Sequence, residues 1–238
     1  CRCALMGNNE CLNLTRPDII KKIHKEYIAA GADIIETNTF SANAVSQAEY
    51  GCSGHAERMA FEGARIAREA ADEAAETAAS IGMSRKVLVA GSIGPTSKSL
   101  SLSPDAGNPA YRSHSFDEMK DIFKKQAAAL INGGADLLLI ETCFDALNTK
   151  AALAAIQELG ELPVMISVSV GDRSGRTLTG QTIEAFLASV AGRKLLSVGL
   201  NCSFGAREMK PFLKRLAEIA PFYVSVYPNA GLPNALGE

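Results

Sequence analysis

The sequence predicts an α/β protein with the (β/α)8 TIM-barrel architecture, of which about six βα units lie within this chain. Two observations support this fold class. Six short runs are apolar throughout, as strands are when both faces of a parallel sheet are buried, and six segments with helical character alternate with them. The last four runs begin near residues 136, 164, 195 and 222, so the chain repeats at roughly one βα unit each time.

The first expected helix begins near Thr15, whose hydroxyl can cap it, with a proline two residues later in the first turn. Ile19, Ile23 and Tyr27 recur every four residues and predict one apolar face. Gly31 predicts the end of this helix, because glycine readily adopts the left-handed conformation that closes a helix.

The elements that follow are predicted by the same kinds of signal. Ser115 and Glu118 have the spacing of a capping box at the start of one helix. A loop rich in Ser, Pro, Gly and Asn precedes that helix over residues 96–114. The expected strands are residues 33–37, 87–93, 136–141, 164–170, 195–200 and 222–227, and the later helices are residues 55–79, 115–133, 145–159, 182–190 and 206–219.

Repeated βα units also fit a doubly wound open sheet. That fold usually carries a Gly-rich phosphate-binding turn after an early strand, and the segment Gly91 to Gly94 is too short for that fingerprint. Regular spacing and polar strand ends favour the barrel. No linker-like stretch divides the chain, so we expect residues 1–238 to form a single domain whose first and last barrel strands lie outside the chain.

The composition argues against several functional classes. With 24 Lys and Arg against 26 Asp and Glu, the formal net charge is −2, too close to neutral for a protein whose main partner is nucleic acid. No run of about 18 uncharged apolar residues is present, so no membrane-spanning helix is expected. The six cysteines have irregular spacing and no C-x-x-C pair, which favours reduced thiols and a cytoplasmic location.

Active sites of TIM barrels lie at the carboxyl ends of the strands, and every expected strand here is followed by polar residues. Two carboxylates, Glu36 and Glu141, and two thiols, Cys143 and Cys202, would face the same mouth. This arrangement predicts a site for a small polar ligand.

Several of these residues also have an ordinary structural interpretation. Glu141 can pair with a neighbouring cation, Asp145 can cap the helix that follows it, and Cys143 can pack in the core. Cys202 is a candidate ligand or nucleophile. The three histidines, His24 among them, lie on or beside expected helices, where we expect them at the surface, so no Ser-His-Asp or Cys-His constellation is predicted.

Several segments, in their order along the chain, resemble the homocysteine S-methyltransferase modules of cobalamin-dependent methionine synthases. The resemblance runs from about residue 7 to the last residue, and its several motifs make it specific. The segments are residues 8–9 (Asn-Asn), 33–40 (Asp-Ile-Ile-Glu-Thr-Asn-Thr-Phe), 94–96 (Gly-Pro-Thr), 102–105 (Leu-Ser-Pro-Asp), 134–142 (Gly-Ala-Asp-Leu-Leu-Leu-Ile-Glu-Thr), 174–181 (Ser-Gly-Arg-Thr-Leu-Thr-Gly-Gln), 199–202 (Gly-Leu-Asn-Cys) and 227–235 (Tyr-Pro-Asn-Ala-Gly-Leu-Pro-Asn-Ala).

The resemblance implies a barrel that binds homocysteine through zinc, held by three cysteines, and methylates it from methylcobalamin to give methionine. Zinc lowers the pKa of the substrate thiol and so makes it a nucleophile. Cys202 matches the first zinc ligand, Glu141 a carboxylate that binds the substrate ammonium group, and Asn229 a residue beside the metal. Glu36 and Asp145 are expected as further pocket residues. The implied partners are cobalamin- and folate-binding modules of the same parent protein.

The sequence departs from that family at both ends. The other two zinc ligands belong to a Gly-Gly-Cys-Cys-Gly motif, which does not occur before Glu238, and the opening Asp-Gly-Ala-Met-Gly-Thr motif is also absent. One thiolate does not make a zinc site, so we expect residues 1–238 alone to bind zinc poorly and to be impaired in methyl transfer. Two alternatives stay open: a non-catalytic pseudo-barrel or interaction domain, and a betaine- or S-methylmethionine-type homocysteine methyltransferase. A barrel lyase or aldolase ranks low, since no lysine follows a strand.

Overall fold

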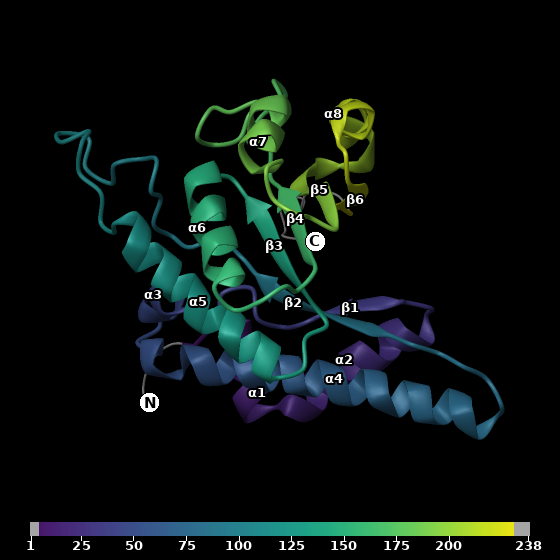
Figure 1. The fold of residues 1–238 in the computed structure, drawn as a ribbon. Helices are drawn as coiled ribbons and strands as arrows, with labels where there is room; N and C mark the ends of the chain where they lie inside the picture. Colours follow the sequence, from purple (N-terminus) through teal and green to yellow (C-terminus); the bar gives the residue numbers. More distant parts are fainter. Residues whose placement is uncertain (1–4, 231–238) are drawn as a thin grey trace, which may run out of the picture.

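A computed structural model describes residues 5–230 and contains one parallel sheet of six strands. The sheet curls into a half-barrel with helices on its outer side, which confirms the expected fold class as a partial (β/α)8 barrel (Figure 1). Each strand pairs with the next one along the chain, so the doubly wound alternative, which requires a reversal of strand order, is excluded. The strands are β1 Ile34–Glu36, β2 Leu88–Ile93, β3 Leu137–Cys143, β4 Val164–Val168, β5 Ser197–Gly205 and β6 Tyr223–Asn229.

All six expected helices are present, with ends within about two residues of the predicted ones. The structure adds two short α-helices and two 3-10 turns that the sequence analysis missed, because an element of one turn shows no measurable periodicity. The α-helices are α1 Leu12–Thr15, α2 Pro17–Ala29, α3 Ala44–Ala48, α4 Ala56–Ser80, α5 Phe116–Asn132, α6 Ala146–Gln157, α7 Ile183–Val190 and α8 Ala206–Ile219, and the 3-10 turns are η1 Asn9–Cys11 and η2 Ser53–His55.

The buried face of α2 differs from the predicted one. Ile20, His24 and Ile28 are buried, whereas Ile23 and Tyr27 are exposed. The buried residues and the predicted ones both recur every four positions and are offset by a single residue. The four-residue spacing alone therefore does not distinguish the two faces of the helix. The expectation of a surface His24 is therefore wrong: the residue is 5% exposed.

Of the three predicted helix ends, the N-cap at Thr15 is wrong and the other two are confirmed. Thr15 is not the N-cap of α2, because its hydroxyl donates to the carbonyl of Cys11 in the preceding turn, at 2.9 Å. The capping box of Ser115 and Glu118 is confirmed at the start of α5. Gly31 follows α2 with a φ of 108°, the left-handed conformation that the sequence predicts there.

Because His24 is buried, we expect the free energy of unfolding to depend on pH. Burial lowers the pKa of this imidazole from 6.5 to about 4. In the unfolded chain His24 is protonated below about pH 6.5, whereas in the folded protein it stays neutral down to about pH 4. The free energy of unfolding therefore falls as the pH is lowered. We expect His24 to account for about 2 kcal/mol of that loss between pH 7 and pH 5. Urea unfolding of His24→Leu at both pH values checks this, since the variant should lose less stability than the wild type; an equal loss would contradict it.

Alternate residues of each strand face either the helices or the barrel interior. Ile140, Ile166 and Leu200 belong to the main apolar cluster between sheet and helices. Their neighbours Glu141 and Asn201 point to the opposite side, which is the interior of the barrel. The sheet therefore presents its polar side chains at the inner face, near the carboxyl ends of the strands.

Close packing of β5 against β6 requires a glycine at position 199. A Cβ atom there would overlap the backbone carbonyl and side chain of Ser225 on the neighbouring strand. We expect Gly199→Ala to lower the free energy of unfolding by about 2 kcal/mol in urea titration, because the backbone has to shift. Gly192→Ala is the matched control, since a Cβ at that position has no atom within 4 Å. Equal stability of the two variants would contradict the packing argument.

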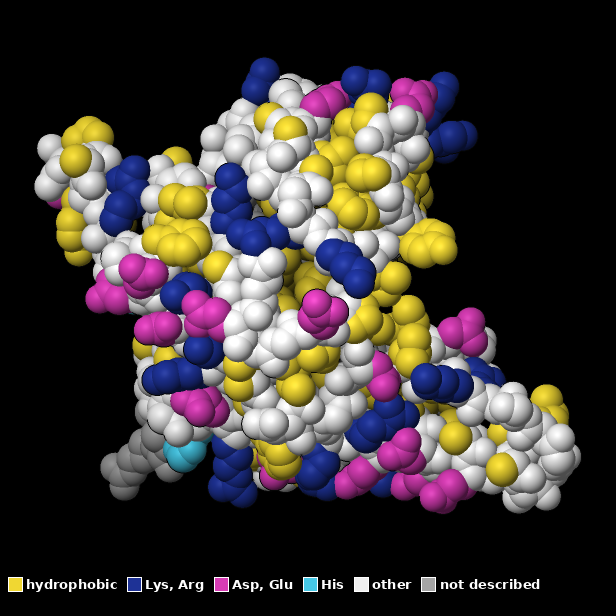
Figure 2. Space-filling model, in the orientation of Figure 1, with side chains coloured by type: hydrophobic (Ala, Val, Ile, Leu, Met, Phe, Trp, Pro, Cys, Tyr) yellow, Lys and Arg dark blue, Asp and Glu magenta, His cyan; other side chains and the backbone are white. Residues whose placement is uncertain are grey.

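Charged side chains of both signs are scattered among polar and hydrophobic ones on the face that Figure 2 shows. Lys21 of α2, for example, pairs with Glu69 and Glu73 of α4, and Lys25 pairs with Glu73 at 2.9 Å. Within residues 5–230, the helices are too short or too polar to cross a bilayer.

Candidate active site

The expected site residues lie along one end of the sheet. Glu36 ends β1, Glu141 lies two residues before the end of β3, Cys202 is in the last part of β5, and Asn229 ends β6. Cys202 is in register with Pro228, so Asn229 follows directly after the neighbour of this cysteine. Asp145 caps α6 just beyond β3.

Glu141 is at the centre of a buried polar cluster. The side chain is 6% exposed, and Ser92 Oγ of β2 donates a hydrogen bond to Glu141 Oε1. The Tyr227 hydroxyl of β6 lies 3.5 Å from Glu141 Oε2. No Lys, Arg or His side chain within residues 5–230 forms an ion pair with Glu141. Pairing with a neighbouring cation, the structural alternative for this residue, therefore does not occur in the described chain.

The pKa values of two titratable groups near Glu141 are raised. Loss of solvation and the neighbouring Glu141 carboxyl raise the pKa of Glu36 to about 9. Burial, and then the nearby negative charge of Glu141, also raise the pKa of Tyr227. Tyr227 therefore keeps its phenolic proton at neutral pH and can donate it.

Cys202 lies in a second polar cluster, beside the first. Asn201 Nδ2 lies 3.4 Å from Cys202 Sγ and donates to Thr142 Oγ1 at 2.8 Å. Thr142 Oγ1 is in turn 3.8 Å from Cys202 Sγ. The backbone N–H of Thr142 donates to Asn201 Oδ1 at 3.1 Å, so one amide side chain joins the ends of β3 and β5. Since Thr142 follows Glu141 directly, these contacts bring the thiol close to the carboxylate cluster.

Backbone strain is concentrated at this same place. Within residues 5–230, the non-glycine residues with positive φ are Thr142, Cys202 and Ser203, at 57°, 54° and 57°. For such residues the left-handed conformation costs of order 1–3 kcal/mol each, and strained residues of this kind cluster at functional sites. The sequence gives no signal for this strain, because none of the three is a residue type that favours positive φ.

Removal of the Asn201 amide is expected to destabilise this cluster. Asn201→Ala leaves the partly buried N–H of Thr142 without its acceptor, which costs about 1 kcal/mol. Urea unfolding measures this loss, and Asn132→Ala, on an exposed residue at the end of α5, is the control with a change within about 0.5 kcal/mol. A loss in Asn201→Ala no greater than in the control would contradict this role.

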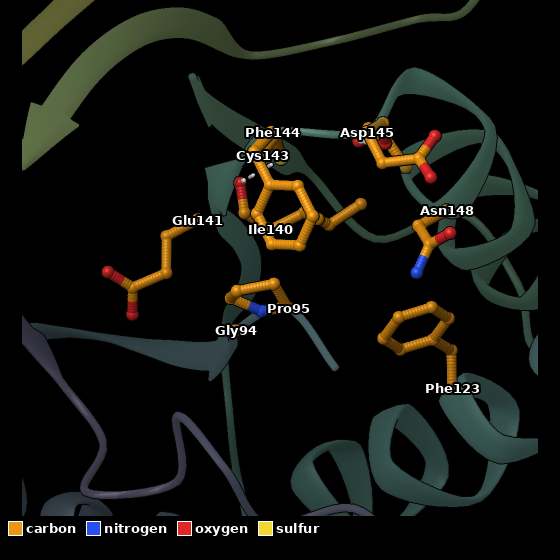
Figure 3. A pocket seen from close by; sticks show the side chains of 10 residues that line it. Gly94, Pro95, Phe123, Ile140, Glu141, Cys143, Phe144, Asp145 and Asn148 are labelled. Atoms are coloured by element: carbon orange, nitrogen blue, oxygen red, sulfur yellow. Dashed lines mark hydrogen bonds between the residues drawn. The ribbon is translucent and has the colours of Figure 1, made fainter. Parts of the chain in front are cut away.

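Cys143 and a small cavity lie on the opposite face of β3. Cys143 is 4% exposed, and burial raises the pKa of its thiol to about 12, so the sulfur is a protonated core group. In Figure 3 the Glu141 side chain points away from the cavity that Phe123, Asn148 and Cys143 help to line. That cavity has a volume of about 20 Å³, room for about one water molecule. The pocket thus does not serve as the binding site for an amino acid.

The Asp145 carboxylate accepts hydrogen bonds from the loop before α5. Ser101 donates to it from both its backbone N–H and its hydroxyl, at 3.0 and 2.6 Å, and Ser99 Oγ donates as well. The backbone N–H of Leu147 completes the N-cap at 2.8 Å. Burial by itself would raise the pKa of Asp145, but the hydrogen bonds from Ser101 and Ser99 outweigh it and lower the pKa. Asp145 therefore anchors this loop at the barrel mouth.

The described residues do not by themselves form a zinc site. Within residues 5–230 no group of three or more His, Cys, Asp or Glu side chains could hold a metal ion. Cys202 offers one thiol, and Asn229 lies on the neighbouring strand. Zinc sites require three or four protein ligands, so this part of the chain could hold the metal only together with other donors.

These features define the class of protein to which the chain belongs: a TIM-barrel protein with carboxyl, hydroxyl and thiol groups gathered at the carboxyl ends of its strands, where enzymes of this fold have their active sites. Residues 2–238 match the family described as homocysteine S-methyltransferase. The chain belongs to this family. Membership supports a methyltransferase that uses homocysteine as its methyl acceptor.

Three structures of the homocysteine methyltransferase MmuM from Escherichia coli are similar to this one. The metallated form has a TM-score of 0.77 and is aligned over 92% of this chain and 75% of that chain. The corresponding values are 0.79, 97% and 77% for the oxidized form, and 0.72, 94% and 76% for the apo form. All three are 22% identical to this chain, so the likeness establishes the fold alone.

Four residues of the two clusters were not predicted as site residues: Ser92, Thr142, Asn201 and Tyr227. Each lies near the polar carboxyl end of a strand, so the signal that found Glu141 and Cys202 also covers them. Their roles depend on contacts between separate strands, which the curvature of the sheet creates. Of the predicted residues, Cys202 and Asn229 lie on the paired strands β5 and β6, with Cys202 in register with Pro228.

Proposed function

We propose that the chain is the larger part of a methionine-forming homocysteine methyltransferase of the cobalamin-dependent methionine synthase type. The observation that carries this proposal is that Thr142, the residue after Glu141, lies against the Cys202 thiol and is joined to β5 by Asn201. Homocysteine carries an ammonium group at one end and a thiol at the other, which matches the Glu141 carboxylate and the Cys202 thiol. In the same proposal, residues 1–238 belong to a single barrel domain.

The chain's own residues would bind and orient the amino acid. Glu141 accepts hydrogen bonds from the substrate ammonium group, while Ser92 and Tyr227 hold the Glu141 carboxylate in place. This directs the substrate thiol toward Cys202 and Asn229 at the ends of β5 and β6. There the homocysteine sulfur attacks the methyl group, and a sulfur–carbon bond forms as the bond from methyl to its donor breaks.

Zinc is the cofactor that the resemblance implies for this thiol. It would be held by Cys202 together with two cysteines expected beyond Glu238, and it would favour the thiolate form of the substrate. Methylcobalamin, bound by another module of the parent protein, is the proposed donor. Four cysteines of the described chain are free thiols, as is typical of a reducing compartment, which supports a cytoplasmic location.

A donor comparison tests the proposal. The natural protein that carries this sequence is incubated with L-homocysteine and, separately, methylcobalamin, betaine or S-methylmethionine, and methionine is measured. We expect methionine from methylcobalamin. Methionine only from betaine or S-methylmethionine would move the protein to the other branch of its family, and no methionine from any donor would support the non-catalytic alternative.

A further inference from the structure

Cys202 lies where the regular pairing of β5 with its neighbouring strands comes to an end. The register of β5 with β4 runs as far as Leu200, and the register with β6 shifts between Cys202 and Gly205. Cys202 and Ser203 both have a left-handed backbone there, with φ of 54° and 57°. Backbone pairing alone therefore does not fix the direction of the Cys202 side chain, and side-chain contacts have to do so.

The side chain of Ser203 attaches this part of β5 to the chain that follows β4. Its hydroxyl accepts a hydrogen bond from the backbone N–H of Val170 at 2.8 Å. The same hydroxyl donates to the backbone carbonyl of Asn201 at 3.1 Å and so connects the two residues on either side of Cys202. These two bonds hold the backbone of Cys202 in its left-handed conformation.

The side chain of Asn201 attaches the same segment to the end of β3. Its Oδ1 accepts the backbone N–H of Thr142 at 3.1 Å, and because a backbone N–H can only donate, this bond fixes which end of the amide is the oxygen. The amide nitrogen therefore faces Thr142 Oγ1 at 2.8 Å and Cys202 Sγ at 3.4 Å. Asn201 is 1% exposed, so water does not compete for these bonds.

We propose that Asn201 and Ser203 are positioning residues for Cys202. Ser203 holds the backbone of the cysteine, and the Asn201 amide donates a hydrogen bond to its sulfur, so the thiol is fixed at the barrel mouth. Metal ligands in proteins depend on such outer partners, which orient the ligand. The inference rests on the proposed function, which gives Cys202 its role as a zinc ligand.

The contact between the amide and the sulfur can be measured in the metal-free protein. Asn201→Ala is made in the natural protein and again in a Cys202→Ala background, and all variants are unfolded in urea after dialysis against a chelator. We expect Asn201→Ala to lower the folding equilibrium constant at least about twofold less when the sulfur is absent. Equal effects in the two backgrounds would overturn the inference.

Zinc affinity tests what the positioning does. Asn201→Ala and Ser203→Ala are each expected to raise the Kd for zinc by about 10- to 100-fold in the natural protein. Asn148→Ala is the matched control, because this buried amide likewise accepts a backbone N–H, that of Leu100 at 2.9 Å, but lies on α6. The control should lose stability and keep the zinc affinity of the wild type. A zinc Kd of Asn201→Ala equal to that of the control would overturn the inference.

Cobalt in place of zinc gives a spectroscopic signature that a merely structural role would not change. A hydrogen bond donated to a thiolate lowers the energy of its sulfur electrons, so its loss should shift the sulfur-to-cobalt charge-transfer band to longer wavelength. We expect this shift in Asn201→Ala and not in Asn148→Ala, and an unchanged band in both would overturn the inference. Failure of the wild type to bind either metal would contradict the proposed function, whereas the urea measurements on the metal-free protein would still decide whether Asn201 holds the Cys202 sulfur.

Discussion

Replacement of Cys202 by alanine is expected to remove bound zinc and methyl transfer together from the natural protein. Cys202 is the described thiol at the barrel mouth, and Asn201 and Thr142 hold its sulfur there. Loss of one thiolate from a three-cysteine site leaves too few ligands for tight binding. The affinity for zinc should fall by more than about 100-fold, beyond the effect of changing an outer partner of a ligand. Metal analysis after dialysis against a chelator, followed by the methionine assay, measures both losses.

Cys143→Ala is the matched control for this experiment. Cys143 lies on the neighbouring strand β3, but its side chain faces the helices and is buried in the apolar core. The control should lose some stability through the small cavity it creates, and it should keep its zinc. Retention of zinc and activity in Cys202→Ala, or equal loss of zinc in both variants, would contradict the assignment of Cys202.

Replacement of Glu141 by glutamine is the second change with a large expected effect. The variant keeps the size of the side chain but removes the negative charge that we propose faces the substrate ammonium group. A hydrogen bond to a charged partner contributes about 2 kcal/mol, which corresponds to a rise of about 30-fold in the Kd for L-homocysteine. Calorimetry measures the affinity, and circular dichroism shows whether the fold is retained.

Glu184→Gln is a suitable control for the Glu141 variant. Glu184 lies in the first turn of α7, and its partly exposed carboxylate pairs with Arg215 of α8 at 2.9 Å. Removing one charge there should change neither affinity nor stability appreciably, since exposed ion pairs contribute little. If Glu141→Gln bound homocysteine as tightly as this control, Glu141 would not be the ammonium-binding group.

The strands were predictable because their signal is local. Residues 137–140, for example, are all apolar and are followed by Glu-Thr, and β3 begins and ends within two residues of the predicted strand, residues 136–141. The same pattern predicted which ends of the strands carry the polar groups. The segment 227–235 could be compared only in part, since residues 231–235 lie outside the described chain.

Contacts between side chains of different strands could not be predicted from the sequence. The Ser92 hydroxyl reaches Glu141 because β2 and β3 are neighbours in a curled sheet, and Tyr227 reaches the same carboxylate from β6 across the barrel interior. The left-handed conformation of Thr142 and Cys202 is a second such feature, since these residue types usually avoid it. The wrong face of α2 has a related cause: burial of His24 depends on packing against elements distant in the sequence.

A structure of the natural protein with zinc and L-homocysteine bound would test the central claim most directly. That claim is that Glu141 and Cys202 hold the two ends of one substrate molecule. We expect the substrate nitrogen within hydrogen-bonding distance of the Glu141 carboxylate, and the substrate sulfur on a zinc ion that Cys202 also ligates. Homocysteine bound at another place, or a zinc ion without Cys202 among its ligands, would contradict the claim.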